Sequence, residues 1–445
     1  MTAKRIVFAA ATLAMALVAQ GVQAQCPSSD PGCTEYTGGS TKTGFFRISI
    51  PSSWNGDLML VNHGFDLDPT NINPHRACKK NNAPCVVDGD CAIVGDVCNE
   101  IDLFGFDEYL LPAGVAVAAS TYSQTGWSVF ASRKDLKAIL KYMKKTPGLG
   151  APARTFVSGF SMGGAVTLDW SIRANPKGTF GIAPLCPAAA GGLASWDAAT
   201  DLRMAFDYTC AGVTGAFFSG PVDQSGQDAF YPTQTQIAIK FDACFGNLLG
   251  SPTTEEQARY DEWLVITGHT GSPLEAATLM GFATQGMYDT VQPKKKLGRK
   301  PIAYNPYGQV TYADAGFDAG VERFPQYPKG RKKLGKNYDP NYLKGKAAKV
   351  TYPIVSLAND DDYLTIPGMN QVIQSAWTAG GKDYTTAWVN GGGHCNFTEF
   401  EVNATVQSML DWADTGTQPS AADIETACLA PVSYTHLTLP TNREV

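Results

Sequence analysis

Charge of either sign is scarce in this chain, and so are internal repeats. Charged residues make up 17% of the 445 positions and apolar residues 44%, which is too little charge for a disordered chain. The 35 basic and 41 acidic residues give a net charge of −6. We therefore expect no nucleic acid as a partner, because nucleic-acid binding needs a basic face. No repeat is apparent, which argues against solenoids and propellers.

Long apolar runs are absent beyond the first 24 residues. There, Lys4 and Arg5 precede an apolar run over Ile6–Val18, and Val22–Ala24 offers the short side chains that a signal peptidase requires. The alternative is a membrane anchor, but a bilayer span needs about 20 apolar residues. We predict that 1–24 is a cleaved signal peptide, that the mature chain is secreted or periplasmic, and that it has no stable membrane anchor.

Cysteine is plentiful, with 11 residues, all beyond the predicted signal peptide. An exported chain meets an oxidising environment, so disulfides are expected. Four cysteines share one polar stretch, where two local disulfides or a zinc site would fit: Cys78, Cys85, Cys91 and Cys98. We favour disulfides there, because the stretch has no Cys-x-x-Cys pair. Cys26 with Cys33, and Cys210 with Cys244, are further candidate pairs, and the odd total leaves at least one thiol over or paired between chains.

Strand and helix patterns alternate through the middle of the chain, which predicts an α/β fold with a mostly parallel sheet covered by helices on both faces. The predicted strands are Phe45–Ile50, Asp57–Asn62, Val115–Ser120, Thr155–Ser158, Phe180–Cys186, Tyr352–Ala358 and Thr385–Val389. The predicted helices are Asp135–Lys145, Gly163–Arg173, Met369–Ala379 and Thr398–Asp414.

Two insertions interrupt this core. The first, 66–101, is the Cys-rich stretch, and the second, 191–348, is too long for a crossover. We expect the second to fold as a lid, with a helix over Thr254–Ile266 and with solvated basic clusters at Lys294–Lys296 and Arg331–Lys333. The core would then comprise 25–65, 102–190 and 349–418, followed by a C-terminal extension, 419–431. The last segment, 432–445, resembles translated sequencing-adapter DNA, and we expect it to be a non-native tail; His436 is set aside with it.

Gly159-Phe160-Ser161-Met162-Gly163 is a G-x-S-x-G motif between a predicted strand and a predicted helix. In that context the motif is typical of a nucleophile elbow, a strained turn that raises the serine hydroxyl above the sheet. The glycines avoid clashes with the neighbouring strand and helix. A plain Gly-rich turn with a buried serine is the alternative.

A serine nucleophile needs a base, and the base needs an orienting acid. Of the five histidines, His394 follows a strand, lies in a glycine-rich loop and precedes a helix, which makes it the candidate base. The candidate acid is Asp362, which lies shortly after the predicted strand Tyr352–Ala358. Asp361 is the runner-up. The chain order is then Ser161, Asp362, His394.

With these motifs the chain resembles the α/β-hydrolase superfamily, most closely its secreted bacterial serine hydrolases and esterases with a large lid. The resemblance spans roughly Phe45 to Thr417 without the two insertions. Asn62–Phe65 is similar to the family's His-Gly segment after the third strand, which implies that the backbone N–H groups of Phe65 and Met162 form the oxyanion hole.

The resemblance implies a secreted serine hydrolase that cleaves a carboxylic ester, small or polymeric, through an acyl-enzyme and without metal or cofactor. A serine peptidase of the same superfamily is the alternative, with a charged anchor such as Glu255, Glu256 or the lysine clusters. A non-catalytic binding protein on the same scaffold is a further one. Phe217 and Phe218 are the candidate lid aromatics at the substrate, and the oligomeric state is left open.

Overall fold

A computed structural model describes 26–65, 101–174, 178–215, 234–291, 311–321 and 349–429, apart from a few single positions, and two short strands inside the Cys-rich stretch. The predicted signal peptide, Phe217, Phe218, both basic clusters and the predicted tail lie outside the described residues, as do the side chains of the four clustered cysteines.

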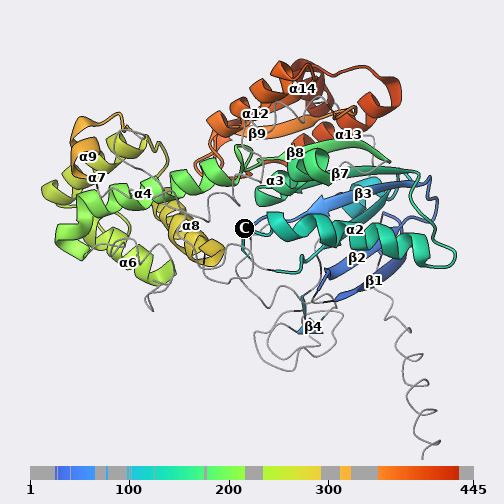
Figure 1. Ribbon diagram of the computed structural model, residues 1–445, viewed down its shortest axis with the longest axis horizontal. Coiled ribbons are helices and arrows are strands. Elements are labelled where there is room, and N and C mark those ends of the chain that lie inside the picture. Colours follow the sequence, from blue (N-terminus) through green and yellow to red (C-terminus); the bar gives the residue numbers. More distant parts are fainter. Residues whose placement is uncertain are drawn as a thin grey trace, which may run out of the picture.

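An eight-stranded sheet runs through the core in the order β1-β2-β6-β3-β7-β8-β9-β10 (Figure 1). Its strands are β1 (Thr34–Ser40), β2 (Gly44–Ile50), β3 (Asp57–Asn62), β6 (Ala116–Ser120), β7 (Arg154–Phe160), β8 (Thr179–Leu185), β9 (Val355–Asp361) and β10 (Thr385–Gly392). The six strands from β6 to β10 in this order are parallel, and β2 pairs antiparallel with both β1 and β6. A separate two-stranded sheet joins β4 (Ala77–Cys78) and β5 (Cys98–Asn99).

Both faces of the sheet are buried, because successive side chains of a strand point to opposite sides. In β3, Leu58 and Leu60 belong to one apolar cluster and Met59 and Val61 to the other. The helices of the first face are α2 (Val129–Lys145), α3 (Met162–Asp169, continued by a π-helical turn over Trp170–Ala174) and α12 (Pro367–Ala379). Those of the second face are α1 (Phe106–Leu110), α13 (Glu399–Thr415) and α14 (Ala421–Leu429). The predicted fold class is confirmed.

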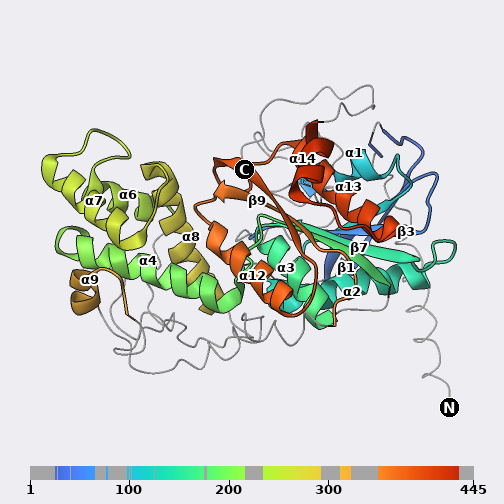
Figure 2. The same ribbon diagram turned by 90° about the horizontal axis from the view of Figure 1, so that it is seen from above.

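A unit of helices lies beside one end of the sheet, and both ribbon views agree on its place (Figures 1 and 2). This unit, which we call the helical insertion, contains α4 (Gly191–Thr214), α6 (Gln234–Phe245), α7 (Thr254–Thr267), α8 (Pro273–Val291) and α9 (Ala315–Gly320). Buried aromatic side chains pack against one another inside it: Phe206, Phe241, Phe245, Tyr260 and Trp263. The segment between β8 and β9 is therefore folded where it is described.

Two of the predicted disulfides are present. Cys26 pairs with Cys33, and Cys210 pairs with Cys244. The second bridge joins α4 to α6, and Cys210 lies roughly 28 Å along α4 from its start, since a helix rises 1.5 Å per residue. The bridge therefore ties the far end of α4 and not the root of the insertion. The one free cysteine among the described residues is Cys428.

Some element boundaries differ from the predicted ones. Strand β9 continues to Asp361, so the acidic run begins inside the strand, and α2 starts at Val129, six residues early. The sequence pattern missed β1, α1 and α14. Strand β1 is polar and mostly exposed at the sheet edge, and α14 buries only Ile424 fully, so neither has the apolar period on which the prediction depends. In the part of the chain that is described, no helix has the length and apolar character needed to cross a membrane.

Candidate active site

Ser161 lies in the sharp turn between β7 and α3, with φ 55° and ψ −118°, a conformation that non-glycine residues rarely adopt. A Cβ added at Gly159 would lie 2.6 Å from Cβ of Asn62, and one at Gly163 would lie 2.1 Å from the carbonyl oxygen of Asn62. Both distances are clashes, so the elbow needs glycine at each flank. The close approach of β3 thus fixes the motif's spacing and presents Ser161 at the carboxyl edge of the sheet.

His394 and Asp362 reach Ser161 from the ends of two other strands. The Ser161 Oγ is 2.8 Å from Nε2 of His394, and Nδ1 of His394 is 2.9 and 3.0 Å from the two carboxylate oxygens of Asp362. A carboxylate can only accept, so Nδ1 donates and Nε2 is left to accept from the serine hydroxyl. The structure therefore brings together the three residues that the sequence singles out, in a serine–histidine–aspartate arrangement.

The carboxylate of Asp362 is held from several sides. Backbone N–H groups of Leu364 and Thr365 each donate to Oδ1 at 2.8 Å, and the Thr365 hydroxyl lies 2.8 Å from Oδ2. Burial alone would raise the pKa of Asp362, but the hydrogen bonds from His394 and from this backbone outweigh it and lower the pKa. Asp362 is therefore ionised at neutral pH and fixes the orientation of His394.

The neighbouring acids have other partners. Asp361, the runner-up, accepts a hydrogen bond from the Thr270 hydroxyl at 3.0 Å, and Asp360 accepts one from the N–H of Gly391 at 3.1 Å. Because β9 continues through Asp361, the side chains of Asp360 and Asp361 point to opposite sides of the sheet. The contact with His394 is made by Asp362, the first residue beyond the strand.

The two residues expected in the oxyanion hole flank Ser161. Met162 opens α3, where backbone N–H groups have no acceptor within the helix. The segment before Phe65 crosses close to the serine, since a Cβ at Gly64 would lie 3.6 Å from Cβ of Ser161. Met162 and Phe65 both line the same cavity as Ser161. Their oxyanion role stays a prediction.

His63 supports this segment, a contribution that the sequence did not reveal. Its ring stacks on Tyr122 with centroids 4.1 Å apart, and its Nδ1 lies 2.9 Å from the carbonyl oxygen of Gly64. The Tyr122 hydroxyl donates to the carbonyl oxygen of His63 at 3.2 Å. These contacts fix the backbone that carries the Phe65 N–H.

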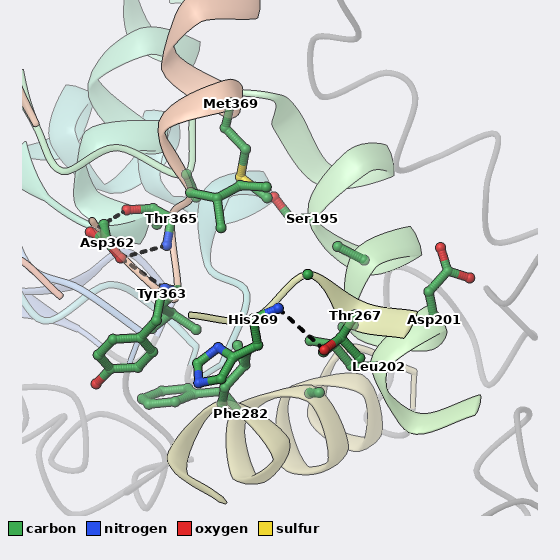
Figure 3. Close-up of a pocket in the computed structure, with 18 of the residues that line it drawn as sticks. Ser195, Asp201, Leu202, Thr267, His269, Phe282, Asp362, Tyr363, Thr365 and Met369 are labelled. Atoms are coloured by element: carbon green, nitrogen blue, oxygen red, sulfur yellow. Dashed lines mark hydrogen bonds between the residues drawn. The ribbon is translucent and has the colours of Figure 1, made fainter. Parts of the chain in front are cut away.

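A cavity of about 690 Å³ opens between the sheet edge and the helical insertion, with Ser161 in its wall. Figure 3 shows Asp362 and Met369 of the core facing Leu202, His269 and Phe282 of the insertion across it. Further apolar side chains complete the wall: Phe65, Trp127, Trp196, Leu279 and Phe317. Burial lowers the pKa of His269, so its ring is neutral at pH 7. No lysine or arginine is among the described residues that line the cavity.

Glu255 and Glu256, candidate anchors for a peptide terminus, are not among these cavity residues. Glu256 instead takes part in a capping box with Thr253 at the start of α7. A disulfide that the sequence analysis did not propose, Cys186–Cys395, lies directly beside His394. The signal for it was the His394-Cys395 pair together with an unassigned cysteine at the end of a predicted strand.

The strand order, the strained elbow and the Ser-Asp-His order along the chain define the α/β-hydrolase fold. No family model and no curated protein matches the chain. Similar solved structures include a bacterial membrane phospholipase A, 14% identical over 86% of this chain and 87% of that one, with a TM-score of 0.38. The esterase Est1E from Butyrivibrio proteoclasticus is 12% identical over 86% and 99%, with a TM-score of 0.38. A puromycin hydrolase is 13% identical over 88% of this chain but 42% of its own, with a TM-score of 0.39. These likenesses do not decide the activity.

Proposed function

We propose that this chain is a serine hydrolase that cleaves carboxylic esters carrying a large, uncharged apolar group. The observation that carries the proposal is the hydrogen-bonded chain from Asp362 through His394 to Ser161 at the wall of a mostly apolar cavity. Cavities of this size and character typically hold small organic ligands.

In the proposed mechanism, Nε2 of His394 takes the hydroxyl proton while Oγ of Ser161 attacks the ester carbonyl. The N–H groups of Met162 and Phe65 stabilise the oxyanion, at about 3–4 kcal/mol for each donor. His394 then returns the proton to the leaving alcohol, and an acyl-enzyme is left on Ser161. A water molecule, deprotonated by His394, attacks the carbonyl of the acyl-enzyme. The bond to Oγ of Ser161 then breaks, His394 returns the proton to Oγ, and the carboxylic acid leaves. Throughout, ionised Asp362 stabilises the imidazolium.

The cavity wall favours a neutral ester over a peptide with a free carboxyl terminus. A free carboxylate would find no lysine or arginine among the described cavity residues. Outside the site itself, three acids in the wall could hold a free amine, and each already accepts a hydrogen bond within the protein: Asp201, Asp360 and Asp361. Aromatic and aliphatic side chains, by contrast, can bury an apolar acyl or alcohol group. Burial of each large apolar side chain by such a group stabilises the complex by about 1.5–3 kcal/mol.

We place this activity outside the cytoplasm. The predicted signal sequence supports this, as do three disulfides among the described cysteines, since stable disulfides are rare in reducing compartments.

The decisive experiment assays purified mature protein against p-nitrophenyl esters of graded chain length, alongside aminoacyl and peptidyl nitroanilides. We expect ester turnover that rises with the length of the acyl group and little release of nitroaniline. Preference for the nitroanilides would favour the peptidase. Absence of both turnover and fluorophosphonate labelling would favour a binding protein.

A further inference from the structure

The disulfide Cys186–Cys395 joins residues that are 209 positions apart and holds their Cα atoms at 5.3 Å. Cys186 follows directly on β8 and is 1% exposed, while Cys395 follows directly on His394. The Sγ atom of Cys395 lies 3.4 Å from Nε2 of His394. The bridge therefore contacts the ring nitrogen that faces Ser161.

Cys186 also contacts Ser161 directly and is linked to Asp362 through Thr365. The N–H of Ser161, which donates to the carbonyl oxygen of Leu185, lies 3.3 Å from Sγ of Cys186. The Thr365 hydroxyl lies 3.1 Å from the carbonyl oxygen of Cys186 and 2.8 Å from Oδ2 of Asp362. One buried residue thus touches the elbow, the support of the acid and, through its disulfide, the base.

The loop that carries His394 needs such an anchor. It follows Gly391 and Gly392 at the end of β10 and begins at Gly393, and glycine loses more backbone freedom on ordering than any other residue. Gly392 pairs with Asp361 at the end of the β9–β10 ladder, and the Gly391 N–H donates to Asp360. The Asn396 side chain donates to the carbonyl oxygen of Gly392, and the carbonyl oxygen of Asn396 accepts from the buried Asn359 side chain at 3.2 Å. The bonds to Asp360 and to the Gly392 carbonyl oxygen are exposed and compete with water, so the disulfide adds a covalent restraint to the segment that carries His394.

We propose that the Cys186–Cys395 disulfide is a positioning element that keeps His394 in line with Ser161 and Asp362. The inference rests on the proposed function and deepens it. A chain without the bridge folds, keeps its cavity and binds substrate, but its imidazole leaves the serine for part of the time. Displacement of a catalytic group by about 1 Å can cost roughly 100-fold in rate.

The test compares the wild type with the double variant Cys186→Ser/Cys395→Ser. The matched control is Cys210→Ser/Cys244→Ser, which removes a buried bridge in the helical insertion. Each folded protein is assayed with the best p-nitrophenyl ester and with a fluorophosphonate, whose labelling rate reports the reactivity of Ser161 independently of the substrate. We expect kcat and the labelling rate of the double variant to fall about 10- to 100-fold with KM changed less than about threefold, and the labelling rate of the control to stay near that of the wild type.

Rescue separates positioning from general stability. Gly392 is outside the left-handed region, and a Cβ there would meet only Asp361 Oδ2 at 3.5 Å, an ordinary contact. Gly392→Ala stiffens the loop, so it should recover part of the lost kcat in the double variant and leave the wild type unchanged. Cys186→Ala/Cys395→Ala replaces the double serine variant if that variant folds poorly. Stepwise reduction of the wild type, with the reduced disulfides identified by mass spectrometry, should lower the labelling rate as the Cys186–Cys395 bridge is lost.

Equal labelling rates in wild type and bridge-free variant would overturn the positioning role while leaving the hydrolase intact. An equal loss in the control pair would overturn it too, because the bridge would then act through stability alone. A wild type that labels at no measurable rate would instead overturn the proposed function, and this inference with it.

Discussion

In the proposed mechanism the reactivity of Ser161 depends on its neighbours, since a free serine hydroxyl is a weak nucleophile at neutral pH. Ser161→Ala should lower ester kcat by roughly 10⁴-fold or more and abolish fluorophosphonate labelling, while circular dichroism stays unchanged. Ser195→Ala is the matched control, because Ser195 lines the same cavity. Labelling that persists in Ser161→Ala would remove this residue from its role.

The acidic run offers an internal comparison between adjacent side chains. Asp362→Asn should lower kcat roughly 10³- to 10⁴-fold, because an amide at this position favours the wrong tautomer of His394. Asp361→Asn should cost less than about tenfold, since Asp361 bonds to Thr270 and not to the histidine. Steady-state kinetics of the two variants decide the matter, and the reverse order would shift the acid by one residue.

Asp362 also links stability to pH. Its pKa is lowered in the fold, so its ionised form stabilises the native state at any pH above the unfolded value, near 3.9, and this contribution is lost as the pH falls through the folded pKa. Below about pH 4, the free energy of unfolding of the wild type should therefore decrease more steeply than that of Asp362→Asn. Urea unfolding between about pH 3 and pH 6 measures both slopes, and parallel curves would contradict the expectation.

At the scale of elements, α4 and α8 of the helical insertion form the wall opposite the sheet edge. Phe282 of α8 lines the cavity, and its ring packs against Phe65 at 6.1 Å between centroids. Removal of this aromatic surface should cost a long apolar ester roughly 1–3 kcal/mol of binding, or about 5- to 150-fold in kcat/KM. Phe282→Ala should show this loss with long esters and little change with acetate.

Val265→Ala is the matched control for this variant. Val265 belongs to α7 of the same insertion but is 73% exposed and does not line the cavity. Equal effects of both substitutions, or an equal loss with acetate, would mean that α8 supports the fold and not the substrate.

At the scale of the whole molecule, the insertion shares one apolar cluster with a face of the sheet but has a disulfide of its own. The Cys210–Cys244 bridge spans 34 residues inside the insertion and in the chain-entropy model contributes about 3–4 kcal/mol. Cys210→Ser/Cys244→Ser should make the insertion unfold at a lower temperature than the sheet, with loss of selection for long esters before loss of fluorophosphonate labelling. A single transition that removes labelling and chain-length selection together would contradict this.

The predictable part of the molecule was local. The predicted strand Asp57–Asn62 matched the structure because a strand buried on both faces is a continuous apolar run. The elbow was recognisable because any side chain larger than that of glycine at its flanking positions would clash with Asn62. Ser161, Asp362 and His394 each follow a strand of one parallel sheet, whose carboxyl ends meet at one edge, so their meeting could be expected from order alone. The polar edge strand β1 and the exposed helix α14 could not, because neither has an apolar period.

The sequence by itself therefore determined the fold class, the three residues of the site and two disulfides, because each depends on a short pattern or on the order of elements. Tertiary structure alone decided which cysteine pairs with Cys395, where the bridge between α4 and α6 lies, and which side chains of the helical insertion face Ser161. These are contacts between segments up to about two hundred residues apart, and no periodicity along the chain encodes them. These contacts form only when the sheet edge, the loop that carries His394 and the helical insertion pack around one cavity.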